Sequence, residues 1–375
     1  MNTHRPRHQQ RGVSLVELMI AMLLGLFLMI GVIQVFVSSK STYNTQESLS
    51  RVQESGRHAI ALIARDLRMA GYSGCGGQAV NVYNHLDIDG NAAQEFLHDF
   101  TAGIYGSEAQ GTGPGDTLDL GQAAPANNWL PDYPDGTGDP ANDIEPLPGS
   151  DVIMVRTMSS SIFSAEGGGG NPIGEASQFG VIGNHDFVAG EILVVSDCVN
   201  STILQIGQMS GNNVSYGGGA GGHDPGNKSN PDWQVEDHIT GDASVGRVET
   251  SVYFVALNDE DVPTLYRQLL SGNTSEPQAI AEGVENMQVL YGVRDGPTIS
   301  VGEYLTAEAV DNANRWDDVI VAEVALLVSD RERLPEGIAD RARTFTLAGY
   351  DLTVEPDGLQ RQIFRARVTL RNRAL

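Results

Sequence analysis

The stretch RGVSLVELMIAMLLGLFLMIGVIQVFV, residues 11–37, joins an apolar run of membrane-spanning length to a single carboxylate near its start. No residue from Leu18 to Ser39 is charged, and a helix needs roughly 20 apolar residues to cross a bilayer. Glu17 stands five residues after Gly12. A carboxylate inside hydrocarbon costs about 2.5–3.5 kcal/mol on insertion scales, so its presence requires an explanation.

The flanks of this run predict its orientation. Residues 1–12, MNTHRPRHQQRG, contain three arginines and no acid. A positive flank stays in the cytoplasm, which predicts that the bulk of the chain lies beyond the inner membrane. The alternative is a cleaved secretory signal peptide, which would end in a small-residue site of A-x-A type. The run instead ends VIQVFVSSK, residues 32–40, which is a poor match.

Two interpretations of Glu17 remain open on spacing alone. In the first, Glu17 lies near the cytoplasmic interface and reaches water. In the second, it meets a cation within an assembly. Cleavage after Gly12 would create an α-amine on Val13, with a pKa of roughly 7.7–8.0. In an array of identical helices, the amine of one subunit would face the carboxylate of the next, and burying such a pair requires both partners.

The segment RGVSLVELMIAMLLG, residues 11–25, resembles the class III signal of type IV pilins and type II secretion pseudopilins. The resemblance implies that a prepilin peptidase cuts after Gly12 and methylates Val13. It also implies that Glu17 governs subunit assembly. Val13 departs from the phenylalanine that usually stands at the first mature position. The resemblance therefore divides the N-terminus into a leader, residues 1–12, and a membrane and assembly helix, residues 13–40.

An amphipathic helix is predicted to continue the membrane helix over residues 41–71. Its apolar positions recur every three or four residues, at Leu49, Val52, Gly56, Ile60, Ile63 and Leu67. No proline interrupts residues 13–70, and Gly71 is the expected C-terminal cap. The prediction is one helix of about 87 Å whose apolar stripe lies against the sheet of a head domain.

The remaining residues, 72–375, predict a periplasmic, β-rich head with long glycine-rich loops, which makes the chain an α+β, pilin-like protein. Alternating runs rich in Val, Ile, Thr and Tyr predict a mostly antiparallel sheet. They are residues 151–157, 191–197, 202–207, 250–257, 264–270, 284–293, 318–329, 344–350 and 364–370. Residues 76–150 and 208–245 are polar and turn-rich, and we expect them to be largely irregular.

Four further segments resemble the PilW family of minor pilins. They are ARDLRMAGYSGC (64–75), GVENMQVLYGV (283–293), RWDDVIVAEVALLVSD (315–330) and FRARVTLRNR (364–373). The resemblance implies a minor pilin that helps to initiate a type IV pilus, or fimbrium, in a priming or tip complex that supports twitching motility. The implied partners are the prepilin peptidase, other minor pilins, the major pilin and the inner-membrane assembly platform. A minor pseudopilin of type II secretion is the alternative, because it would share the same N-terminus.

Two cysteines, Cys75 and Cys198, stand after the long helix and after a predicted strand. An oxidising periplasm favours a disulfide between them, with two separate buried thiols as the alternative. The chain-entropy model gives such a cross-link a stabilising effect of roughly 4–5 kcal/mol.

Composition and motifs give no reason to expect catalysis. The formal charge of −25 would repel nucleic acid, so no nucleic-acid partner is expected. GHDPGNKS (222–229) has the wrong spacing for a P-loop and suggests a flexible loop. The acidic segments 87–91 and 132–145 lack the EF-hand pattern, which favours solvated turns over calcium sites. We therefore predict no enzyme activity, no cofactor and no metal. A membrane-anchored periplasmic binding protein or enzyme is the third alternative.

Overall fold

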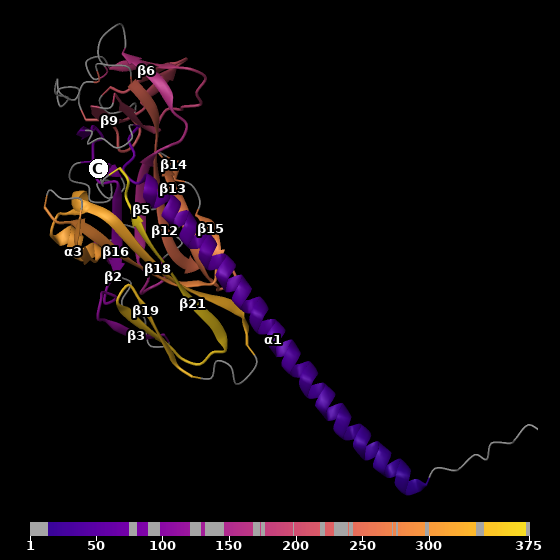
Figure 1. Ribbon diagram of the computed structural model, residues 1–375. Coiled ribbons are helices and arrows are strands. Elements are labelled where there is room, and N and C mark those ends of the chain that lie inside the picture. Colours follow the sequence, from indigo (N-terminus) through magenta and orange to yellow (C-terminus); the bar gives the residue numbers. More distant parts are fainter. Residues whose placement is uncertain are drawn as a thin grey trace, which may run out of the picture.

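The computed structural model describes residues 14–74, 81–88, 98–120, 129–131, 146–167, 173, 177–197, 199–217, 222–228, 239, 243–271, 273–274, 277–296, 300–334 and 341–372. One long helix leads into a strand-rich head (Figure 1). The α+β, pilin-like architecture expected from the sequence is confirmed.

Helix α1 (Leu15–Met69) is continuous through the membrane-like half and the amphipathic half. Its residues are exposed as far as Lys40, whereas Val52, Gly56, Ile63 and Leu67 are buried against the head. The predicted apolar stripe is therefore confirmed in its central positions. The helix ends at Met69, one residue before the predicted end. Gly71 has the left-handed φ of 71° expected after a helix, but its N–H donates to the Arg156 carbonyl of the head.

Helix α1 packs on one face of a four-stranded antiparallel sheet. In spatial order the strands are β17 (Val301–Leu305), β16 (Val284–Arg294), β18 (Val319–Arg333) and β21 (Leu359–Thr369). Side chains alternate across a strand, so Val324, Leu326 and Val328 share a core with α1. Ala325 and Leu327 point to the other face, where they pack against a small second sheet.

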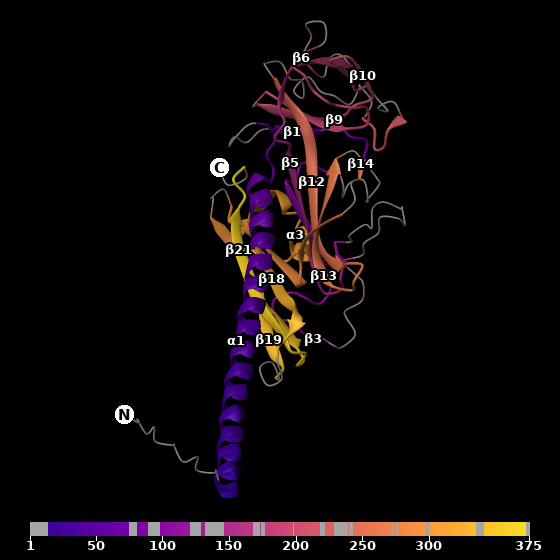
Figure 2. The same cartoon turned by 90° about the vertical axis from the view of Figure 1, so that its right-hand side faces the viewer.

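The second sheet consists of β19 (Arg343–Leu347), β20 (Tyr350–Val354) and β3 (Thr117–Leu120). It lies at the end of the head from which the free half of α1 emerges (Figures 1 and 2). The sequence predicted one strand over residues 344–350, and that prediction is wrong. Ala348 and Gly349 both have positive φ, 50° and 93°, which is the geometry of a two-residue hairpin.

The largest sheet has fourteen strands and is organised around β12 (Ala243–Leu257). Towards its C-terminal end β12 pairs with β5 and β13, and its first residues pair with β6 and β8. The other strands are β1 (Asn81–Asn84), β2 (Ile104–Ala109), β4 (Trp129–Leu130), β5 (Val152–Met158), β6 (Phe163–Gly167), β7 (Gln178–Ile182), β8 (Ile192–Ser196), β9 (Asn200–Gln205), β10 (Gln208–Ser210), β11 (Asn213–Ser215), β13 (Pro263–Ser271), β14 (Asn273–Thr274) and β15 (Gln278–Glu282). Two short helices complete the described elements, α3 (Ala307–Asn312) and a 3-10 turn (Trp316–Asp318).

Strands β6 to β11 form a distal lobe with its own apolar core, which includes Phe179, Leu204 and Tyr216. This lobe lies beyond the C-terminal end of α1, at the end of the head remote from the free half of the helix (Figures 1 and 2). Several of its strands, together with β1 to β4, fall in or beside segments 76–150 and 208–245. The expectation that those segments are largely irregular is therefore wrong for their described parts. Short strands flanked by glycine carry too little periodicity to be recognised.

Candidate assembly site

Glu17 lies in the first turn of α1, within a helix half that touches no other part of the described chain. The most apolar window of α1 has a mean hydropathy of 2.7 and is entirely unburied, so this half is long and apolar enough to cross a membrane. Side chains around Glu17 are exposed, for example Leu15 at 75% and Val16 at 62%. Gly12 and Val13, the predicted processing residues, lie outside the described residues. No cation of the described chain lies beside Glu17, so any charged partner of this carboxylate would have to come from another molecule.

Arg51 anchors the middle of α1 to the end of β18. Its guanidinium contacts Asp330 at 2.9 Å, Glu332 at 2.5 Å and Glu47 of its own helix at 3.1 Å. The spacing of four residues within one helix predicts only the pairing with Glu47. Three carboxylates around one guanidinium fix the angle at which α1 leaves the head more firmly than an isolated surface pair would.

Asp66 is a second anchor, which the sequence analysis missed. It is 8% exposed and accepts hydrogen bonds from the Tyr253 hydroxyl at 2.6 Å and from Arg267 at 2.9 Å. A signal for it was present: Asp66 follows Ile63 by three residues and therefore falls on the buried stripe. A buried carboxylate requires such partners, so its occurrence on that stripe indicates a cation in the facing sheet.

The last turn of α1 is held from the other end of the chain. The Asn372 amide donates to the carbonyls of Met69 and Ala70, at 3.4 and 3.2 Å. Free carbonyls at a helix end need such donors. The contact joins the end of α1 to the residues that follow β21, so the first and the last of the four segments that resemble PilW meet in space.

Cys75 and Cys198 both lie outside the described residues, but their neighbours are close together. The Ser201 hydroxyl contacts the Ser73 hydroxyl at 3.2 Å and the Ser196 hydroxyl at 2.7 Å. A Cβ built on Gly74 would lie 3.4 Å from the Cβ of Ser196. The described residues that precede Cys75 and flank Cys198 therefore lie close together.

Three aromatic residues, Trp316, Tyr291 and Tyr304, are expected from the sequence to pack the core rather than bind a ligand. Trp316 is buried, with its ring centroid 4.9 Å from Tyr291 and 4.5 Å from Tyr105. Its indole N–H donates to Asp311 at 2.9 Å. Core packing is therefore confirmed for Trp316 and Tyr291. Tyr304 is 36% exposed and lies under the Arg367 guanidinium, so for this residue the prediction is wrong.

The loop that resembles a P-loop is tied to the distal lobe through Asn227, which is 2% exposed. Its amide donates to the carbonyls of Gln205 and Tyr216 and its oxygen accepts from the Gln205 N–H. The described part of this segment is thus fixed in place, and the predicted flexible loop is wrong there. Of the acidic segments, residues 89–91 and 132–145 lie outside the described residues. Among the residues that are described, no group of three His, Cys, Asp or Glu side chains could hold a metal ion.

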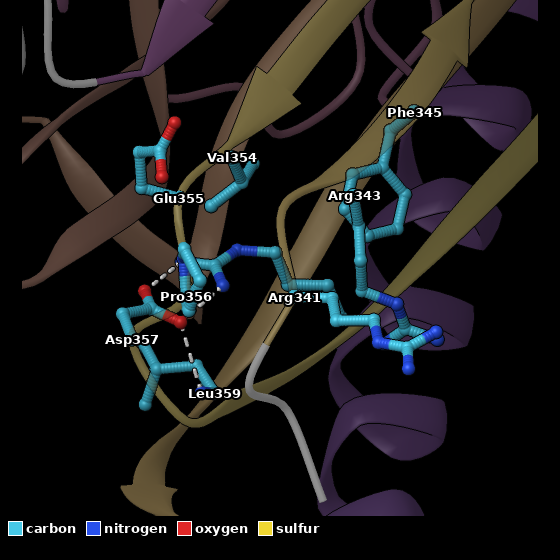
Figure 3. Close-up of a pocket in the computed structure, with 9 residues that line it drawn as sticks. Arg341, Arg343, Phe345, Val354, Glu355, Pro356, Asp357 and Leu359 are labelled. Carbon is cyan, nitrogen blue, oxygen red and sulfur yellow. Dashed lines mark hydrogen bonds and ion pairs between the residues drawn. The ribbon is translucent and has the colours of Figure 1, made fainter.

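A shallow hollow lies where β19, β20 and the start of β21 meet (Figure 3). It is lined by Arg341, Arg343, Phe345, Val354, Glu355, Pro356, Asp357, Leu359 and Arg361. Arg361 is nearly buried and contacts Glu285 at 2.6 Å and Asp357 at 2.5 Å. Arg341 and Arg343 are exposed, and the structure gives neither of them a carboxylate partner among the described residues.

Acid should weaken the region around β18 and β21. Hydrogen bonds from Arg361 lower the pKa of Asp357. Burial raises the pKa of Asp330, but the hydrogen bonds and charge of Arg51 outweigh it and the pKa is lowered overall. Both carboxylates therefore stabilise the fold above the ordinary value of about 3.8, and this stabilisation is lost as the pH falls through their lowered values. The midpoint temperature of thermal unfolding of the detergent-solubilised chain should decrease as the pH is lowered from 4 to 2.5. In Asp357→Asn the midpoint temperature should depend less steeply on pH. An unchanged pH dependence would contradict the role given to Asp357.

Comparison with known families matches both ends of the chain. Residues 7–33 match the prokaryotic N-terminal methylation motif, and residues 252–372 match type IV pilus-assembly protein W. The second match covers β13, β15, the four-stranded sheet and the hollow, but leaves out the distal lobe. Neither a curated protein nor a solved structure matches the chain significantly. The chain is thus similar to prepilins at its N-terminus and to type IV pilus-assembly protein W over its C-terminal third, and both matches support a minor pilin of a type IV pilus.

Proposed function

We propose that this protein acts at the start of type IV pilus assembly, in a priming or tip complex with other minor pilins. The leader would be residues 1–12, with the N-terminus cytoplasmic and the head, residues 72–375, periplasmic. The prepilin peptidase would cleave after Gly12 and methylate Val13. Glu17 would then meet the amine of a neighbouring subunit, and the inner-membrane assembly platform would move the complex outward. Twitching motility would depend on the pili so formed.

One observation carries the proposal of a tip position: the distal lobe extends past the C-terminal end of α1. Subunits of a helical filament stack along their long helices, so a head that continues beyond its own helix occupies space needed by a subunit above it. The first subunit has no subunit above it. A low-copy role at the tip therefore suits this shape better than a repeated role in the shaft.

Processing is tested by Gly12→Val. A β-branched residue at the cleaved position should block the peptidase and leave a slower-migrating precursor on a gel, with pili strongly reduced. The mass of the mature N-terminal peptide is the direct measurement, and it should begin with a methylated Val13. A mature chain that begins at Met1, or that is trimmed beyond the apolar run, would contradict the proposal.

The tip assignment itself is tested by gold labelling of an epitope inserted in the distal lobe. Labels at filament ends support it, whereas labels along the shaft contradict it. Deleting the gene and scoring twitching against secretion of exoproteins separates a pilus role from a role in type II secretion.

We further propose that Cys75 and Cys198 form a disulfide. The support is the contact of Ser201 with Ser73 and Ser196, which brings the flanking chain segments together. The bond would link the end of α1 to the turn between β8 and β9. Mass spectrometry of non-reduced peptides from exported protein should find the two cysteines joined. Two free thiols in that material would contradict the pairing.

A further inference from the structure

We propose that the hollow beside β20 and β21 docks an acidic segment of the next pilin subunit to join the filament. Arg341 and Arg343 line the hollow, and Arg333 pairs with Leu359 beside them; we call these three arginines the arginine pole. This inference rests on the proposed function, because it requires that the protein precede other subunits in the filament.

The arginine pole lies at the membrane-facing end of the head. Asn372, just after β21, contacts the end of α1, so the start of β21 is at the opposite end. Phe364 lies against Gly56, and Leu359 precedes it by five residues, or about 17 Å of strand. That length equals roughly 11 helical residues, which places Leu359 level with about residue 45 of α1. Arg333 pairs with Leu359. The pole is thus near the point at which α1 would emerge from the membrane.

The three arginines of the pole are exposed, and within the described residues none of them contacts a carboxylate, unlike the neighbouring arginines. Arg331 contacts Glu260 and Glu282, Arg361 contacts Glu285 and Asp357, and Arg51 contacts Asp330. By contrast, the structure shows Arg343 only over the Phe345 ring, at 6.0 Å. Arg333 and Arg341 have no ion pair within the described part of the chain.

The construction of the hollow favours a carboxylate ligand. Arg361, Val354 and Pro356 form a fixed wall, since Arg361 is held on both sides by acids. Arg341 and Arg343 project from the rim beside it (Figure 3). A guanidinium binds a carboxylate through two parallel hydrogen bonds, so a pair of arginines at a rim selects an acidic side chain. Glu355, which also lines the hollow, is an acid of the chain itself that would compete with the ligand.

The occupant is identified by topology. Every subunit leaves the same membrane, so a subunit that joins later must approach from the membrane side of this head. The first surface that it meets is the arginine pole. A partner there has an upper head surface exposed to the periplasm, where acidic loops can reach the arginines without loss of the helix contacts made through Glu17.

A photo-crosslinking experiment tests the occupant directly. Benzoylphenylalanine placed at Phe345 in the full-length chain keeps an aromatic ring in the hollow. In sheared pili, the expected product is a crosslink to a segment of another subunit that contains Asp or Glu, identified by peptide mass spectrometry. A crosslink to phospholipid, a crosslink confined to residues 335–340 of the same chain, or no crosslink would each overturn the proposal.

Charge variants test the chemistry. Arg341→Glu with Arg343→Glu should lower the amount of this chain in sheared pili by about three- to tenfold. Arg341→Lys with Arg343→Lys should retain most of it. The matched control is Arg68→Glu with Arg371→Glu, two exposed arginines at the opposite end of α1, and near-normal incorporation is expected. The level of processed chain in the membrane shows whether each variant folds.

Failure of this inference is distinguishable from failure of the proposed function. If the charge-reversed variant enters pili as well as the wild type does, the arginine pole is not a docking surface and the function stands. If the wild-type chain is absent from pili, the proposed function itself is wrong.

Discussion

Replacing Glu17 with alanine should leave processing intact and reduce surface pili by at least about tenfold. In the assembled state the carboxylate would neutralise the amine of a neighbouring Val13. Removing one partner of such a desolvated pair leaves an uncompensated charge, at a cost of about 3–5 kcal/mol. Glu17→Gln should behave in the same way, because it keeps the shape of the side chain but removes its charge. Pili are counted by electron microscopy, and the processed chain is quantified by immunoblotting.

Glu54→Ala is the matched control for Glu17. Glu54 is also an exposed acid on α1, but it lies in the half that is attached to the head, and the structure shows no ion pair for it among the described residues. We expect near-normal piliation. If Glu17→Ala also shows wild-type piliation, the pairing of the carboxylate with a liberated amine is wrong, and Glu17 serves only as an interfacial residue.

Gly283→Ala should destabilise the head by about 2–5 kcal/mol. Gly283 joins β15 to β16 with a φ of 83°, which a side chain disfavours. A Cβ there would lie 2.2 Å from the Ser329 carbonyl oxygen, and this oxygen is backbone that cannot rotate away. Two backbone hydrogen bonds fix this approach: the Gly283 N–H donates to the Pro263 carbonyl, and the Gly283 carbonyl accepts from the Ser329 N–H. Thermal unfolding of the purified chain measures the effect, together with loss of processed protein in cells.

Gly296→Ala separates the two causes. Gly296 has a φ of 60°, but nothing lies within 4 Å of the position of its Cβ. It should therefore show only the backbone strain, about 1–2 kcal/mol. Equal effects for the two variants would mean that the close approach of Ser329 contributes nothing.

Local patterns were sufficient where one periodicity covers many residues. The single helix over α1, its buried positions and the long strands β16, β18 and β21 all follow from apolar spacing and β-branched content. The hairpin of β19 and β20 was missed because Ala348 takes a left-handed conformation that alanine rarely adopts, so its residue type gave no turn signal. Glycine-flanked strands such as β10 and β11 were missed because three residues cannot establish a period.

By itself the sequence determined that a long helix carries one acid in an apolar half and that a strand-rich head follows, because both depend on residues close together in the chain. Only the tertiary structure decided what lies across from these residues. Asp66 gains Arg267 and Tyr253, Arg51 gains Asp330, and Arg343 is left facing outward beside an arginine whose charge is already satisfied. The physical reason is that charge pairing acts through space over a few ångströms, between positions that lie far apart in the sequence, and no local pattern records it.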